Sequence, residues 1–147
     1  MMEEADLEVI FQEITTPNKL FCQFEPEEGV LFLDVKNPFT EEDFNIIADI
    51  IDPYFSKHGE LKGIIVNSKK FPYWVSTQNR AEYFKFAENN HYKFKKAALS
   101  MGGFFTKIVA ITARKRVHAE VKTFRYNDIE KAQIWVLNQI KNLKSPR

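Results

Sequence analysis

The sequence predicts a single α/β domain built on a mixed sheet of about six strands with about four helices. Three observations predict this fold class: three alternating apolar stretches open the chain, helical and strand patterns then alternate to its end, and the connections are short. A chain of 147 residues suits one domain and can bury a sufficient core without disulfides or metals. We therefore expect residues 1–147 to form one domain, in which N-terminal antiparallel strands are followed by a βαβαβα order.

The first forty residues show the alternation of an antiparallel meander. Apolar positions alternate over residues 7–12, again around Cys22, and again over residues 30–36. Turn residues separate these stretches at 15–18 and 26–29. Cys22 is the only cysteine and falls at an apolar position, so we expect it to be buried and structural.

A helix should follow the third strand. Thr40 is its expected cap, and Asp43 completes a weaker form of the capping box. Pro53 should kink or shorten the last turns, and Gly59 suits the C-terminal cap. The apolar stripe at helical spacing consists of Phe44, Ile47, Ala48, Ile51 and Phe55.

The middle of the chain predicts alternating strands and helices. Residues 61–67 are apolar enough for a central strand buried on both faces. A helix over residues 76 to about 90 and a strand over residues 97–101 should follow. A third helix is expected over residues 104–116, although the stretch 108–112 is also good strand sequence.

The chain should end with a strand and a helix. The last strand is expected at Val121 to Tyr126, and Asn127 should cap the final helix with Glu130 completing the box. Short strand-to-helix-to-strand links predict right-handed connections and parallel pairing of the later strands. The stripe of the last helix consists of Ile129, Ala132, Val136, Ile140 and Leu143.

The order of elements resembles the SpoIIAA-like branch of the STAS and Sec14-related α/β proteins. The resemblance covers roughly residues 18–143 and rests on pattern and length in LFLDVKNPFTEEDF, LKGIIVN, KKAALSMGGFF and EVKTFRYNDIEKAQIWV. In the anti-sigma-factor antagonists that name the fold, a serine in an Asp-Ser-Ser-Gly turn after the central strand is phosphorylated. The resemblance therefore implies a regulatory or interaction module that acts through this loop.

The matching stretch in this chain departs from that turn. Val75 replaces the acidic residue and Gln78 replaces the glycine, while two hydroxyls remain at Ser76 and Thr77. Phosphorylation of either hydroxyl is physically plausible, because a helix N-terminus stabilises negative charge and Arg80 lies within one turn. The simpler interpretation is that one hydroxyl is an ordinary helix cap.

The family resemblance also implies a second class of function, because Sec14-related proteins hold apolar ligands beneath a movable helix. The chain has 14 Phe, more than we expect its core to need. These rings could instead complete the core or a homodimer contact, where aromatic anchors are common. The candidate partner or ligand groove comprises Ser68, Phe71, Tyr73, Trp74, Tyr83 and Phe86.

A third candidate is the pair Gly102 and Gly103, with Lys107 one turn away. Two glycines at a strand-to-helix turn let backbone amides approach an anion. The spacing matches neither a P-loop nor a dinucleotide fingerprint, and a tight turn explains both glycines without a ligand.

Catalytic, metal and cofactor sites are not predicted. His58, His91 and His118 are widely separated and lack catalytic or metal-spaced companions, so we expect a non-enzymatic protein without metal or cofactor. Basic residues interleave with aromatics at 92–96 and cluster at 114–116, but the acidic first segment opposes a nucleic-acid footprint.

The first 60 residues and the rest of the chain carry opposite net charges. Residues 1–60 hold 15 acidic and 3 basic side chains, a charge of −12, and the rest hold 5 and 18, a charge of +13. This division could steer a partner or support head-to-tail association, unless the folded sheet interleaves the charges. A secretory signal and a membrane-length apolar run are missing from the sequence, so we expect a cytoplasmic protein with a protein partner or a second copy.

Overall fold

The computed structural model describes residues 12–37, 40–69, 80–101 and 118–138, with side chains from residue 85 onward in the helix that begins at Arg80. Its elements alternate as the sequence predicts. In chain order they are β1 (Gln12–Thr15), β2 (Phe21–Glu25), β3 (Val30–Asp34), α2 (Glu41–His58), β4 (Leu61–Ser68), α3 (Arg80–Asn90), the 3-10 turn η1 (His91–Lys93), β5 (Phe94–Met101), β6 (Glu120–Phe124) and α5 (Ile129–Leu137).

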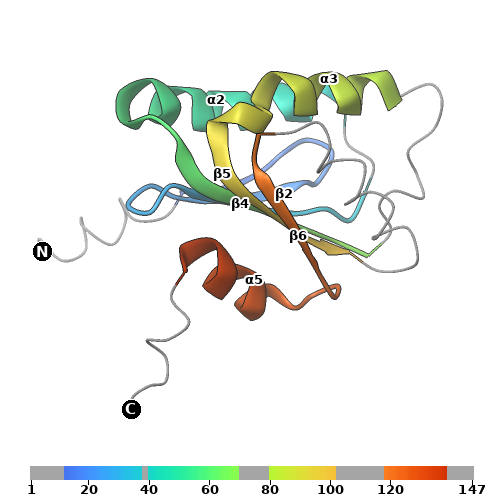
Figure 1. Ribbon diagram of the computed structural model, residues 1–147. Coiled ribbons are helices and arrows are strands. Elements are labelled where there is room, and N and C mark those ends of the chain that lie inside the picture. The colour runs from blue at the N-terminus through green and yellow to red at the C-terminus, as the bar shows by residue number, and fades with distance from the viewer. Residues whose placement is uncertain (1–11, 38–39, 70–79, 102–117, 139–147) are drawn as a thin grey trace, which may run out of the picture.

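One sheet of six strands organises the described chain, and its strands lie in sequence order from β1 to β6. β1, β2 and β3 pair antiparallel, and β3, β4, β5 and β6 pair parallel. Figure 1 shows α2 and α3 on one face of the sheet and α5 on the other. The predicted mixed sheet is confirmed. The described residues contain three α-helices of the expected four, and the helix predicted over 104–116 lies outside them.

Two apolar layers enclose the sheet. The larger lies under α2, where Ile47 and Ile51 are fully buried against side chains of β2, β3 and β4. The smaller lies under α5 and consists of Ile65, Ala98, Ala132 and Val136. The fourth strand is buried from both sides because Leu61 contributes to the first layer and Ile65 to the second. This arrangement confirms the prediction of a doubly covered central strand.

The start of α2 is fixed by the predicted cap and by one residue that the sequence did not single out. The backbone N–H of Thr40 donates to Asp43 Oδ2 at 2.9 Å. Asn18, in the turn between β1 and β2, donates to the same Oδ2 at 2.9 Å and to Thr40 Oγ1 at 3.1 Å. The first turn of α2 is therefore tied to the hairpin at the edge of the sheet.

The end of α2 differs from one expectation. The helix continues through Pro53 to His58, so the predicted shortening does not occur. Proline removes one backbone donor, but Phe55, two residues later, packs against the larger apolar layer and favours continued helix. Gly59 is the C-terminal cap as predicted, with φ of 84° and its N–H donating to the Phe55 carbonyl.

Strand boundaries also shift by a few residues. β1 extends to Thr15, which was expected in a turn, because Thr15 pairs with Phe21. β5 begins at Phe94 rather than Ala97, because Phe94 pairs with Leu61. β6 ends at Phe124, two residues before the predicted Tyr126. Pairing with a neighbouring strand, which local sequence does not encode, sets each of these boundaries.

Gly63 lets α5 lie close to the sheet. A Cβ atom at this position would stand 2.7 Å from Val136 Cγ1 and 2.9 Å from the backbone oxygen of Lys96. Both separations are shorter than van der Waals contact, and one neighbour is backbone that cannot rotate away. The contact between β4 and α5 therefore requires the absence of a side chain at Gly63.

We predict that Gly63→Ala lowers the free energy of unfolding by about 1–3 kcal/mol, because the added methyl group overpacks the smaller layer. Urea unfolding followed by circular dichroism measures the change. In a double-mutant cycle, Gly63→Ala and Val136→Ala together should cost less than the sum of the single changes. Strictly additive costs would show that the close approach to Val136 is not what destabilises the variant.

Candidate functional site

Polar side chains stand in register at the carboxyl ends of three parallel strands. Strand pairing places Asp34 beside Asn67 and Asn67 beside Ser100. All three project from the face that α5 covers, since Ile65 and Ala98 lie two positions earlier on β4 and β5. We call Asp34, Asn67 and Ser100 the polar row. Open α/β sheets bind ligands outside the carboxyl ends of their strands, so this edge is the candidate functional site.

Asn67 connects the polar row to the turn before α5. Its Oδ1 accepts the backbone N–H of Asn127 at 2.8 Å, and its Nδ2 donates to Asp34 Oδ1 and Asn127 Oδ1, each at 3.3 Å. Its backbone carbonyl accepts the N–H of Val35 at 2.9 Å. Only 1% of Asn67 is exposed. One buried side chain therefore joins the ends of β3 and β4 to the segment that follows β6.

Ser100 is the unsatisfied member of the row. The residue is fully buried, and its hydroxyl oxygen has no hydrogen-bond partner among the described residues. An unpaired buried hydroxyl costs about 1–3 kcal/mol, so packing stability does not explain its presence in a strand core. Within the described residues, the Ser100 hydroxyl therefore has an open hydrogen-bonding position at this edge of the sheet.

The prediction that Asn127 caps the final helix was wrong. Asp128 occupies the cap position, and α5 begins at Ile129. Asn127 adopts φ of 70°, a left-handed conformation that asparagine tolerates better than most residues. In that conformation both its backbone N–H and its side chain reach Asn67. The tertiary contact therefore overrides the local capping preference.

The structure describes two residues of the predicted partner or ligand groove. Ser68 ends β4 and is fully buried. Phe86 of α3 stacks on Phe44 of α2 with ring centroids 4.5 Å apart and packs against the larger apolar layer. A groove that includes these residues stays a prediction. The side chains of Phe71, Tyr73, Trp74, Ser76, Thr77 and Tyr83, and the turn of Gly102, Gly103 and Lys107, lie outside the described residues.

Cys22 faces α2 from β2 and is fully buried, as predicted. Burial raises the pKa of its thiol to about 11, and the negative charge of nearby Asp43 adds to this shift. Asp43 is itself fully buried, and its Oδ1 has no hydrogen-bond partner in the described part of the chain. The Cys22 thiol is therefore neutral and protected, which argues for a structural role.

The three histidines do not share one environment. Sequence separation suggested that none had a companion, but the structure brings His91 and His118 into contact, with the His118 backbone N–H donating to His91 Nδ1 at 2.9 Å. The ring of His58 instead packs on Tyr54, with the two ring centroids 4.7 Å apart. The contact between His91 and His118 has no local signal, because the two residues are 27 positions apart in the sequence.

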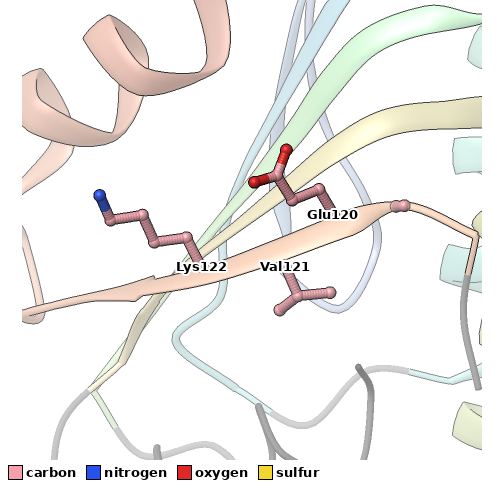
Figure 2. Close-up of a pocket in the computed structure, with 4 residues that line it drawn as sticks. Glu120, Val121 and Lys122 are labelled. Carbon is pink, nitrogen blue, oxygen red and sulfur yellow. The ribbon is translucent and has the colours of Figure 1, made fainter. Parts of the chain in front are cut away.

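A separate hollow of about 340 Å³ lies along the first residues of β6. Its lining within the described chain consists of Ala119, Glu120, Val121 and Lys122. Figure 2 shows Glu120 and Lys122 on the α5 side of the strand and Val121 on the opposite side. The hollow lies beside the first residues of β6, whereas Ser100 of the polar row pairs with Phe124 at the carboxyl end of the same strand. It is therefore distinct from the polar row.

Two further structural findings concern metal ligands and membrane-spanning helices. The described residues contain no group of three or more His, Cys, Asp or Glu side chains placed to hold a metal ion. None of the helices in the same residues is long and apolar enough to cross a membrane. The cytoplasmic location stays a prediction.

Comparison with known proteins connects this fold to a family. A family model described as SpoIIAA-like matches residues 30–137, from the first residue of β3 to the last residue of α5. Among solved structures, the chain is similar to an uncharacterized protein from the DUF3478 family with a SpoIIAA-like fold, from Shewanella loihica PV-4. The TM-score is 0.52, the identity is 14%, and the match covers 86% of this chain and 91% of that chain. This likeness shows the fold alone. No curated protein matches the chain.

We predict that Asn67→Ala lowers the free energy of unfolding by about 2–4 kcal/mol, because it leaves the Asn127 N–H and Asp34 without their buried partner. Chemical denaturation measures the loss. Asn45→Ala is the matched control, since Asn45 is exposed on α2 and its replacement should change stability by less than about 0.5 kcal/mol. Equal losses in both variants would contradict the anchoring role of Asn67.

We predict a pH dependence of stability that belongs to Cys22. The raised pKa means that the neutral thiol contributes fully below its ordinary value of 9.0, and this contribution is lost as the pH rises toward about 11. The difference in unfolding free energy between the wild type and Cys22→Ala should therefore shrink over this interval. A difference that stays constant with pH would show that the thiol ionises alike in both states.

Proposed function

The chain belongs to the SpoIIAA-like family, and on this premise we propose that it is a non-enzymatic regulatory or interaction module that binds a protein partner through the loop after β4. The fixed carboxyl end of β4 supports this function most directly. Asn67 holds that end to β3 and to the turn before α5 through four hydrogen bonds. A loop that leaves such an anchored strand presents its side chains from a rigid base.

The loop sequence supplies suitable contact residues. Phe71, Tyr73 and Trp74 lie within six residues after Ser68, and aromatic side chains are the usual anchors of protein interfaces. We propose that these three rings make the central contact and that Ser68, Tyr83 and Phe86 border it. The partner is either another protein or a second copy of this chain.

A specific observation also favours an apolar ligand as the second candidate. Phe86 is partly buried and reaches the core through its stack on Phe44, so α3 contributes an aromatic contact at the α2 side of the sheet. In this alternative the aromatic residues of the loop and of α3 would enclose a small lipid-like molecule, as in Sec14-related proteins. The same aromatic residues serve both candidates, so an experiment must separate them.

We predict that the double variant Tyr73→Ser, Trp74→Ser loses at least about tenfold of its affinity for the partner recovered with the wild type, while its unfolding midpoint is unchanged. Quantitative affinity capture from native extract, followed by mass spectrometry, measures the loss. Tyr92→Ser is the matched control, because Tyr92 is an aromatic residue with 47% exposure at the amino end of β5. If Tyr92→Ser loses the partner and the double variant keeps it, the interface includes Tyr92 and not the loop.

Native mass spectrometry separates the two candidates. We expect natively purified protein to appear without extra mass, as a monomer or as a dimer. Extra mass that disappears on denaturation, with a change in Trp74 emission, would favour the apolar ligand instead. A covalent increment of about 80 Da that survives denaturation would indicate one phosphate group and would revive Ser76 and Thr77 as a candidate phosphorylation switch.

A further inference from the structure

Two histidines and a glutamate meet at the amino ends of the parallel strands, the opposite edge from the polar row. The Nε2 atom of His118 lies 2.5 Å from Glu60 Oε2, and the backbone N–H of His118 donates to His91 Nδ1 at 2.9 Å. Glu60 directly precedes β4, His91 begins η1 before β5, and His118 stands two residues before β6. These two contacts connect the segments that lead into β4, β5 and β6.

The hydrogen bond at His91 is compatible with only one protonation state. Its Nδ1 accepts from a backbone N–H, so this nitrogen carries no proton and the ring is neutral. Protonation turns Nδ1 into a donor that faces another donor, and the hydrogen bond is lost. The donor belongs to the backbone of His118 and cannot adjust by rotating a side chain.

The side chain of His118 responds in the opposite sense. Protonation gives it a positive charge beside the Glu60 carboxylate and strengthens that contact, because charge-assisted hydrogen bonds exceed neutral ones. Exposed fractions of 52% for the His118 side chain and 30% for the Glu60 side chain leave both open to solvent protons. On acidification, the hydrogen bond from the His118 backbone to His91 therefore weakens, while the contact between the His118 side chain and Glu60 becomes stronger.

Other charged or titratable residues belong to the adjoining elements. Lys93, two residues from His91 in the chain, binds Asp52 at 2.6 Å and Asn90 at 2.9 Å, so its charge is paired with a carboxylate. The Tyr92 ring lies 6.0 Å from the His91 ring, His58 is the last residue of α2, and Glu120 is the first residue of β6.

We infer that Glu60, His91 and His118 form a pH-dependent latch at the amino end of β6. While its ring is neutral, His91 attaches the backbone before β6 to η1. Protonation of the ring releases this attachment, while Glu60 keeps hold of the His118 side chain. The latch is independent of the proposed partner and of the loop after β4.

Amide hydrogen exchange of the folded protein tests the latch directly. In the wild type, the protection factor of the His118 amide, corrected for the intrinsic pH dependence of exchange, should fall about tenfold between about pH 7.5 and about pH 5.5. Long-range nitrogen-proton NMR at the higher pH should show a proton on His91 Nε2 and none on Nδ1. A protection factor that is equal at both pH values, or a proton on Nδ1 at the higher pH, overturns the inference.

Three variants identify the titrating group. His91→Asn places an amide oxygen near the position of Nδ1 and accepts the hydrogen bond at every pH, so the His118 amide should stay protected at both values. His118→Ala keeps the backbone donor, and its residue 118 amide should retain the pH response. His58→Ala is the control and should behave as the wild type. A pH response that survives in His91→Asn would exclude His91 as the switch.

Discussion

The buried side chain of Asn67 is the constraint on which the carboxyl edge of this sheet depends. Its amide uses both donors and its acceptor to hold Asp34 and Asn127, two residues that are far apart in sequence. β4 lies between β3 and β5 and is covered on both faces. The neighbouring strands and the two apolar layers therefore also restrain its end. The loop that follows therefore starts from a fixed point, which is what a recognition loop requires.

The same strand order explains how both ends of β6 are secured. After the strand, Asn127 is bound to Asn67 at the carboxyl edge. Before the strand, His118 is bound to Glu60 and His91 at the amino edge. The first attachment consists of neutral amides and is insensitive to pH, whereas the second depends on a neutral imidazole. Acidification would thus loosen one end of β6 and leave the candidate interaction edge in place.

Strand order also bears on the uneven charge of the chain. Because the strands lie in sequence order, the acidic first strands occupy one side of the sheet and cannot interleave with the last two. Some charges of the two parts of the chain are nevertheless paired in the described residues, as between Lys62 and Glu28 and between Lys93 and Asp52. Strand order and these ion pairs therefore both shape the charge that the fold presents to a partner.

Local chemistry in the sequence determined the element order, the mixed sheet, the cap of α2 at Thr40 and the burial of Cys22, because alternation, helical spacing and capping act between residues close in the chain. It did not determine the polar row, the role of Asn127 or the contact of His91 with His118. Those features depend on strand register and on contacts across the sheet, which local sequence does not encode. Only the tertiary structure brings these residues together, and the hydrogen bonds of Asn67 are strengthened because both faces of β4 are covered and water is excluded.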